Sequence, residues 1–301
     1  MSFGTESCLY IWRPINSGLN LVIQVRSPCA EGDISRIWRW CGCAGPIWCC
    51  HERGDHHVRK ISGKSVLITG ANRGIGQALV EEALNRGAAR VYAGSRQGFS
   101  HSDARVVPLM LDVTDAGQIR DAADTVDSLD VLVNNAGIAL YDDLSDRALL
   151  EQHLAVNFFG TYAVTQAFLP LLIRSGGAIV NNLSVNALAP LPLIPAYSIS
   201  KAAAFNMTQS LRAFLADSGV SVHAVLTGPT DTDMTRGLDI PKAAPESIAR
   251  AILDGVDRGD EDIFPDPMSQ WIAGDWRNGA TKALERQYAE LLADAARATA
   301  E

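Results

Sequence analysis

The sequence has no cysteine beyond residue 60, because all six cysteines of the 301-residue chain lie in residues 1–60. The rest of the chain therefore cannot hold a disulfide, which is typical of proteins in a reducing compartment and predicts a cytoplasmic location. Long apolar runs are also missing: Arg13 and Pro14 interrupt the apolar residues 8–12, and no run reaches the length of a bilayer span. No secretory leader is recognisable.

The chain also lacks an excess of positive charge. It has 26 Lys and Arg against 34 Asp and Glu, a formal net charge of −8. A basic surface is the usual electrostatic footprint of proteins that bind nucleic acids or anionic membranes. We therefore expect neither a nucleic-acid partner nor a membrane partner.

Residues 1–60 differ from the rest of the chain in composition. Besides the cysteines they hold four of the six tryptophans, and their net charge is +2 whereas that of residues 61–301 is −10. The cysteines occur as Cys-x-Cys and as adjacent pairs, which does not match the usual spacing of zinc ligands, so we expect no metal site. We expect this extension to be disordered, or to reflect a translation start placed too far upstream, and to precede one domain of residues 61–301.

A strand, a glycine-rich turn and a helix are predicted in succession from residue 65. Residues 65–69 (SVLIT) form the short apolar run of a buried parallel strand. The turn GANRGIG, residues 70–76, leads into an amphipathic helix that we expect to end at Gly87. Backbone N–H groups at a helix N-terminus favour an anion, and glycines let a pyrophosphate approach the backbone. This context predicts a dinucleotide cradle rather than a simple turn.

Apolar strands alternate with helical stretches along the rest of the chain. Alternation of this kind predicts an α/β fold, a Rossmann-like doubly wound parallel sheet in a single domain. Ligands of such sheets bind at the carboxyl ends of the strands. The further strands are expected at residues 91–95, 106–111, 131–135, 178–184 and 222–227, with long helices at about 145–173 and 270–298.

Tyr197 and Lys201 are four residues apart, about one helical turn, so their side chains share a helix face. An ammonium beside a phenol favours the phenolate and lowers the tyrosine pKa. Such a tyrosine can exchange a proton with an alcohol oxygen, and Ser184 can hydrogen-bond the same oxygen if the loop 185–195 folds back. The pair alone could also be an exposed aromatic–cation contact. The glycine-rich turn upstream favours the catalytic interpretation.

Taken together, these motifs resemble the short-chain dehydrogenase/reductase family, in its short NADP(H)-preferring type. The resemblance spans residues 61 to about 265, and it implies hydride transfer between NADP(H) and a small carbonyl or alcohol substrate. It further implies that Tyr197 is the general acid/base, that Ser184 orients the substrate oxygen, and that Lys201 holds the nicotinamide ribose. Asn157 would anchor a water, and the protein would be a homodimer or homotetramer. The matching series is Thr69-Gly70-x-x-x-Gly74-x-Gly76, Asn134-Asn135-Ala136-Gly137, Asn157, Ser184 and Tyr197-x-x-x-Lys201.

The residues after the second predicted strand favour NADP(H) over NAD(H). An acidic residue there would bind a free ribose 2′-hydroxyl, but this chain has Ser95 and Arg96, and Arg73 lies in the glycine-rich turn. Guanidinium groups bind phosphate with paired donors. The alternative is that either arginine is simply solvated.

The remaining cofactor contacts follow from the resemblance. Asp112 would accept from the adenine amine, although it could instead cap the helix that begins near residue 114. Thr227 occupies a position where the family usually has proline, which leaves the backbone there less fixed. The complete set of expected contacts is Gly70, Arg73, Gly74, Ile75, Gly76, Ser95, Arg96, Asp112, Val113, Asn135, Ala136, Gly137, Tyr197, Lys201, Gly228, Thr230 and Thr232.

The loop 185–195 is apolar and contains three prolines, so it predicts a stiff apolar wall beside Tyr197 and an apolar carbonyl substrate of moderate size. Two other functional classes stay open. One is a non-catalytic NADP(H)-binding regulator with the same fold. The other is a nucleotide-sugar epimerase or dehydratase of the related extended type, which normally needs a longer C-terminal substrate domain.

Overall fold

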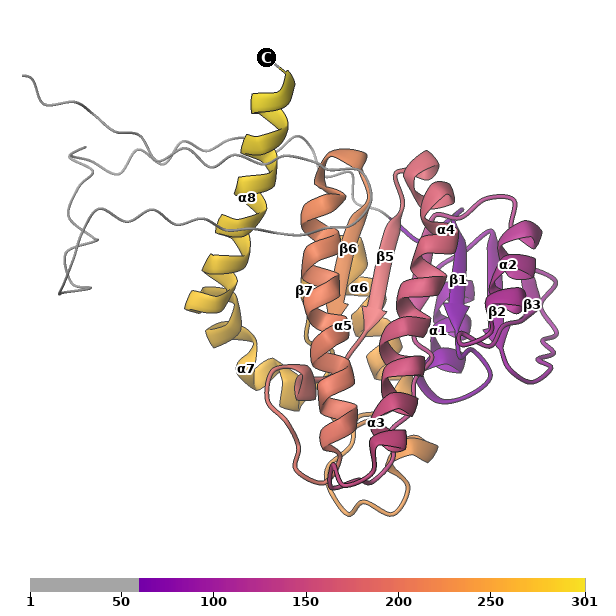
Figure 1. Ribbon diagram of the computed structural model, residues 1–301. Helices are drawn as coiled ribbons and strands as arrows, with labels where there is room; N and C mark the ends of the chain where they lie inside the picture. The colour runs from indigo at the N-terminus through magenta and orange to yellow at the C-terminus, as the bar shows by residue number, and fades with distance from the viewer. Residues whose placement is uncertain (1–59, 301) are drawn as a thin grey trace, which may run out of the picture. The chain divides into compact units, whose positions relative to one another are not determined.

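The computed structural model describes residues 60–300, with side chains through residue 290, as one parallel sheet covered by helices (Figure 1). The predictions of a disordered extension and of its domain boundary concern residues that lie almost entirely outside this range. The strand order is β3-β2-β1-β4-β5-β6-β7, and every neighbouring pair is parallel. This confirms the Rossmann-like doubly wound α/β fold. The strands are β1 (Ser65–Thr69), β2 (Arg90–Ser95), β3 (Val106–Met110), β4 (Val131–Asn134), β5 (Ala178–Asn182), β6 (Ser221–Val225) and β7 (Asp262–Ile263).

Every strand expected from the sequence is present, with bounds within two residues of the prediction. The pattern did not predict β7, because two residues followed by Phe264 and Pro265 are too short to show any periodicity. The α-helices of the described residues are α1 (Gly74–Asn85), α2 (Ala116–Thr125), α3 (Arg147–Leu154), α4 (Thr161–Ser175), α5 (Pro195–Phe214), α6 (Pro245–Arg258), α7 (Pro267–Asn278) and α8 (Ala280–Ala300).

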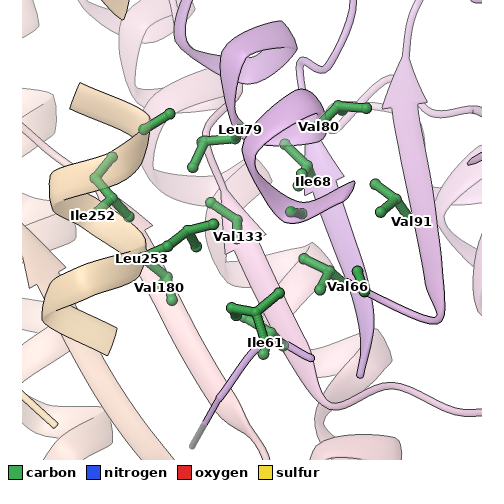
Figure 2. Packing of buried hydrophobic residues seen from close by; sticks show 14 of the residues in the cluster. Ile61, Val66, Ile68, Leu79, Val80, Val91, Val133, Val180, Ile252 and Leu253 are labelled. Carbon is green, nitrogen blue, oxygen red and sulfur yellow. The ribbon is translucent and has the colours of Figure 1, made fainter. Parts of the chain in front are cut away.

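Two apolar layers hold the helices on the sheet, one on each face. Figure 2 shows the layer in which Leu79 of α1 and Ile252 of α6 pack over Ile68, Val133 and other strand side chains. On the other face, side chains of α2 and α4 pack over Leu67, Leu132 and Ile179. Successive side chains of a strand point to opposite faces, so each strand supplies both layers. This explains why the strands are continuous apolar runs.

The predicted long helix at 145–173 is divided into α3 and α4 by a π-helical turn, Ala155–Gly160. Asn157 lies in this turn, and asparagine is a poor helix former. Single π turns in helices are frequent at functional sites. The stretch Arg147–Ser175 has the length and composition of a membrane-crossing helix. Its inner side chains Val164, Phe168 and Leu172 are fully buried against the sheet, which accounts for much of its apolar composition.

The prediction of one helix over residues 270–298 is wrong. The helical path breaks at Gly279, whose backbone is extended (φ −78°, ψ 159°), and α8 begins at the next residue. A Cβ at residue 279 would lie 2.7 Å from the carbonyl oxygen of Asp275, so a larger residue would not fit this corner. The apolar periodicity continues through the glycine, which is why the pattern suggested a single helix.

Candidate active site

A cavity of about 830 Å³ opens at the carboxyl ends of the strands, above the point where β1 and β4 lie side by side. The strand order reverses direction there, which is the usual ligand position in doubly wound sheets. Nearly all residues predicted for the site line this one cavity, although they come from segments spread over residues 70–232. They are Gly70, Arg73, Gly74, Ile75, Gly76, Ser95, Arg96, Asp112, Val113, Asn135, Ala136, Gly137, Ser184, Tyr197, Lys201, Gly228, Thr230 and Thr232.

The glycine-rich turn has the shape of a phosphate cradle. Gly70 and Gly74 have positive φ angles of 65° and 54°, and a Cβ at Gly76 would lie 2.0 Å from the carbonyl oxygen of Gly70. Only glycine fits this packing without strain. The N-terminus of α1 carries neither a side-chain cap nor an acidic residue in its first turn. Its N–H groups and dipole can therefore serve a bound pyrophosphate, and the residues fit a dinucleotide.

Hydrogen bonds lock this turn to the end of β4. The Thr69 hydroxyl oxygen accepts from the backbone N–H groups of Asn135 and Ala136 at 2.9 and 3.0 Å. The Asn135 side chain donates to the carbonyl oxygen of Thr69 at 2.9 Å. One residue earlier, the Asn134 side chain donates to Thr165 and Asn181, both at 2.9 Å. The two asparagines thus brace the sheet at the end of β4.

Tyr197, Lys201 and Ser184 meet on the opposite side of the cavity. Pro195 occupies the first turn of α5, where its missing N–H is not needed, and so the helix starts just before Tyr197. The Tyr197 and Ser184 side chains are hydrogen-bonded. Lys201 Nζ donates to the backbone carbonyl of Asn182 at 2.8 Å and lies 5.7 Å from the centre of the Tyr197 ring. All three predicted side chains are buried at the cavity wall.

The net shift of the Tyr197 pKa is opposite to the lowering that was expected from the neighbouring Lys201. Burial raises the pKa of Tyr197 to about 12, although the hydrogen bond with Ser184 opposes this rise. Burial also lowers the pKa of Lys201 to about 8. In both cases the low-polarity surroundings disfavour the charged form. Tyr197 therefore keeps its proton at neutral pH.

Asn157 lies behind the cavity wall and does not line it. Its side chain exchanges two hydrogen bonds with the backbone of Ile138, at 2.9 and 3.0 Å, and donates to Ser200 Oγ at 2.9 Å. Ser200 in turn donates to the backbone carbonyl of Tyr197 at 2.7 Å. Asn157 thus clamps the loop after β4 to the helix that carries Tyr197. Its predicted role as a water anchor stays a prediction.

Two polar residues support the catalytic helix, and the sequence pattern did not single them out. Both carboxylate oxygens of Asp142 accept from the backbone N–H of Ala196 at 3.2 Å, which caps the N-terminus of α5 from a distant loop. The fully buried His153 bonds the carbonyl of Leu149 at 2.7 Å and accepts from the N–H of Leu140 at 3.0 Å. Its ring also forms an edge contact with Tyr197 at 6.4 Å between centroids. The sequence pattern gives no signature for either role, because Asp142 lies 54 residues from Ala196 and His153 lies 44 residues from Tyr197.

The residues predicted to contact the adenosine ribose differ in whether they already have a hydrogen-bond or ion-pair partner within the described part of the protein. Arg96 is exposed at the cavity edge, and no carboxylate of residues 60–290 pairs with it. Arg73 is not simply solvated, because it forms an exposed ion pair with Asp233 at 3.2 Å. The Ser95 hydroxyl donates to the carbonyl of Gln97 and so is used within its own turn. Arg96 is therefore the most available donor for a phosphate at this corner.

Asp112 does not cap α2, so this alternative is wrong. Its carboxylate accepts from the N–H and hydroxyl of Thr114 at 2.9 and 2.7 Å, whereas Asp115 caps the helix through the N–H groups of Gly117 and Gln118. Asp112 and Val113 both line the cavity where the resemblance expects the adenine. The adenine contact itself stays a prediction.

The segment after β6 folds over the glycine-rich turn. A Cβ at Gly74 would lie 3.1 Å from the methyl group of Thr232, so the two segments are in close contact. The N–H of Gly228 donates to Asp266 at 2.7 Å, and a Cβ at Gly228 would lie 2.4 Å from that carboxylate. Glycine is needed at 228 for this close approach. Its N–H is therefore engaged within the protein, and only its other atoms can contact a nicotinamide.

Asn182 and Thr227 also line the cavity, and the predicted site did not include them. The Thr227 hydroxyl donates to the Asn182 side chain at 2.8 Å, which ties the ends of β6 and β5 together. A side-chain hydrogen bond thus restrains the backbone at the position where the family usually has proline. The sequence did contain a signal for Asn182, namely the pair Asn181-Asn182 inside an apolar strand. Buried amide side chains need hydrogen-bond partners, so the pair indicates a polar network at the end of β5.

The chain belongs to the short-chain dehydrogenase family, whose family model matches residues 64–242. Among curated relatives, estradiol 17-beta-dehydrogenase 2 of Mus musculus is 34% identical over 203 residues, which cover 62% of this chain and 53% of that protein. The short chain dehydrogenase pigC of Monascus ruber is 35% identical over 201 residues, covering 60% and 66%. This chain therefore matches only about half of the mouse protein's length.

Solved structures give the same family. A short chain dehydrogenase from Burkholderia cenocepacia, solved in complex with NADP, is 38% identical to this chain. The superposition has a TM-score of 0.70 and covers 76% of this chain and 98% of that structure. ElxO, solved with NADP bound, is 26% identical with a TM-score of 0.59, and it covers 66% of this chain and 93% of that structure.

Proposed function

We propose that the protein is an NADP(H)-dependent oxidoreductase that interconverts a carbonyl compound and an alcohol. The observation that carries this proposal is the position of Ser184, Tyr197 and Lys201 on the same cavity as the glycine-rich turn. A proton donor and a dinucleotide cradle are the two parts that such a reaction needs. Purified protein is expected to consume NADPH only when a ketone or aldehyde is added, as followed by nicotinamide absorbance.

A bound nicotinamide supplies the hydride for reduction or accepts it in oxidation. Tyr197 donates its proton to the carbonyl oxygen of the substrate, because its pKa of about 12 keeps it protonated at neutral pH. Ser184 hydrogen-bonds Tyr197 and so lies where it can orient the same oxygen. Lys201 is a cation below pH about 8 and can hold the nicotinamide ribose.

NADP(H) is favoured over NAD(H) by the charges at the adenosine end of the cavity. Arg96 is exposed there, and the end of β2 has no carboxylate that would repel a 2′-phosphate. The NADP complexes of the two related structures support the same choice. Arg73 could contribute only by exchanging Asp233 for the phosphate, since the two now form an ion pair.

Replacing Arg96 by alanine is expected to weaken NADPH binding while leaving NADH binding nearly unchanged. A lost charge-assisted hydrogen bond is worth about 1.5–3 kcal/mol, so the Kd of NADPH should rise about 10- to 100-fold. Arg90→Ala is the matched control, since Arg90 is exposed at the opposite end of β2 and its loss changes the net charge equally. Titration by nucleotide fluorescence measures both. Equal weakening of NADPH and NADH by Arg96→Ala would refute a phosphate contact.

We infer an apolar carbonyl substrate with a bulky group. The substrate side of the cavity is lined by Tyr141, Leu193, Met234 and Ile240. A second pocket of about 440 Å³ lies between the turn Val185–Ala187 and α7, and it shares Val185, Asn186 and Met268 with the main cavity. Its walls are mostly apolar and include Trp271 and Trp276. An apolar group that extends beyond the reacting carbonyl can enter this pocket.

Replacing Trp271 by alanine is expected to raise KM for a ketone that carries a ring system by about tenfold, because the apolar contact with the indole is lost. A short aliphatic ketone cannot reach the second pocket, so its KM should stay unchanged and serves as the control. Trp271 is exposed, hence the variant should fold normally. If both ketones were affected alike, the second pocket would not be part of the substrate site.

The alternative is a non-catalytic NADP(H)-binding regulator. Tight NADPH binding without any carbonyl-dependent consumption, over a panel of ketones, aldehydes and alcohols, would support this function.

We propose that the protein is a homo-oligomer and that α4 contributes to its interface. Tyr162 and Ile173 are large apolar side chains of α4 that are each about half exposed, and Phe159 in the π-helical turn before α4 is exposed to a similar degree. Exposed apolar patches of this kind commonly mark protein interfaces. Light scattering should show the mass of a dimer or tetramer, and the Tyr162→Glu variant should have a lower particle mass.

The cytoplasmic location also stays a prediction, which cell fractionation would test.

A further inference from the structure

The carboxyl ends of four neighbouring strands are joined by one chain of side-chain hydrogen bonds. Thr227, after β6, donates from Oγ1 to Oδ1 of Asn182 in β5 at 2.8 Å. Asn182 donates from Nδ2 to Oδ1 of Asn135, after β4, at 2.9 Å. Asn135 then donates from Nδ2 to the carbonyl oxygens of Thr69 and Gly70 at 2.9 and 3.3 Å. Every link has the same donor direction, because the carbonyl oxygens of Thr69 and Gly70 can only accept and so set the orientation of both amides. Asn182 Oδ1 is thereby left to accept from the Thr227 hydroxyl.

This chain of hydrogen bonds contacts the parts of the site that hold the nucleotide and the catalytic lysine. The backbone carbonyl of Asn182 is the acceptor for Lys201 Nζ at 2.8 Å. Asn135 Nδ2 packs so closely on the glycine-rich turn that a Cβ at Gly76 would lie 2.7 Å from it. Thr227 and Asn182 are both buried. A shift of Asn182 would therefore move the Lys201 anchor and the cradle together.

We propose that Thr227 is a positioning residue whose hydroxyl aligns Lys201 and the glycine-rich turn for the dinucleotide through Asn182 and Asn135. This inference rests on the proposed function, since it takes the dinucleotide to bind in the main cavity. A proline at this position would restrain the backbone by its ring but has no hydroxyl to donate. Thr227 and Asn182 thus act as a pair, and the pair needs a hydroxyl at residue 227.

The test measures NADPH affinity rather than turnover. Thr227→Val has nearly the same shape but leaves the buried Asn182 Oδ1 without its donor, and the Kd of NADPH should rise about five- to tenfold. Thr227→Ser keeps the hydroxyl and should stay within about twofold of the wild type. Thr227→Pro should resemble Thr227→Val, because only the donor matters. A Thr227→Val protein with wild-type affinity, or a Thr227→Ser protein as weak as Thr227→Val, would overturn the proposal.

A matched control separates positioning from general loss of stability. Thr165→Val removes another buried hydroxyl, which accepts from Asn134 at 2.9 Å but does not line the cavity. It should lower Tm without changing the Kd of NADPH.

The double variant keeps the test decisive if Thr227→Val alone unfolds. Asn182→Leu with Thr227→Val leaves no unpaired group between the two residues, so it should bind NADPH no more weakly than Asn182→Leu alone. Additive losses would overturn the proposal. A wild-type protein that binds no dinucleotide would instead overturn the proposed function.

Discussion

Replacing Tyr197 by phenylalanine is expected to lower kcat for carbonyl reduction by about a hundred- to ten-thousandfold while NADPH still binds. The variant removes only the hydroxyl that donates the proton, and general acid catalysis contributes about 10²- to 10⁴-fold. The ring remains, so the edge contact with His153 and the packing of α5 should be kept. Single-turnover kinetics and NADPH titration measure the two effects separately.

Tyr288→Phe is the matched control for Tyr197→Phe, because Tyr288 is exposed on α8 and its loss removes the same atom outside the cavity. Near wild-type turnover by Tyr197→Phe would refute the assignment of the proton donor. The pH profile gives an independent check: the pKa of Lys201 is lowered to about 8, so the cation is lost as pH rises through that value. Carbonyl reduction at limiting substrate should therefore decline above about pH 8.

Replacing Lys282 by methionine is expected to destabilise the protein by about 3 kcal/mol or more, because removing one partner strands buried charges. Lys282 is almost completely buried at the start of α8 and contacts three carboxylates. Its Nζ lies 2.7 Å from Asp262, 2.9 Å from Glu285 and 3.1 Å from Glu261. Arg212 is then the remaining cation of this cluster in the described residues. Thermal unfolding should show a Tm lowered by about 10 °C.

Lys64→Met is the matched control for Lys282→Met. Lys64 pairs with Asp130 at 2.9 Å but is partly exposed, and exposed pairs are worth at most about 1 kcal/mol. The pH dependence gives a second readout, because Lys282 and Arg212 hold the pKa values of Glu261 and Asp262 below their usual range despite burial. Stability from lowered carboxyl pKa values is present at neutral pH and is lost as pH falls through those values. The difference between Lys282→Met and the wild type should therefore shrink in acid. Equal Tm changes for the two variants would contradict the assignment.

The sequence predicted the fold well because its strongest signals are local. Each strand is a short apolar run bounded by turn residues, and the glycine-rich turn lies directly between a strand and a helix. The same reasoning missed β7 and the break at Gly279, because two residues show no period and a glycine can continue an apolar pattern. Tertiary pairing decided the first point, since β7 exists through its parallel pairing with β6. At Gly279 the backbone passes so close to the carbonyl oxygen of Asp275, four residues earlier, that no side chain fits.

The candidate site was predictable where residue type alone limits the chemistry. Tyr197 and Lys201 are one helical turn apart, so they share a helix face wherever that helix lies in the fold. Gly76 is required because the turn brings it so close to Gly70 that no side chain fits. The electrostatics were not predictable in this way. Whether Lys201 lowers the Tyr197 pKa depends on burial and distance, and burial reversed the expected direction.

The sequence by itself determined the fold class, the dinucleotide cradle and the identities of the candidate proton donor and its neighbours, because these depend on local spacing and side-chain chemistry. Only the tertiary structure decided which groups remain available. It paired Arg73 with Asp233, engaged the Gly228 N–H with Asp266, and linked Thr227 to Asn182. These partners are separated by 38 to 160 residues, and no local pattern encodes such contacts. They form because the parallel sheet brings the ends of its strands to one edge.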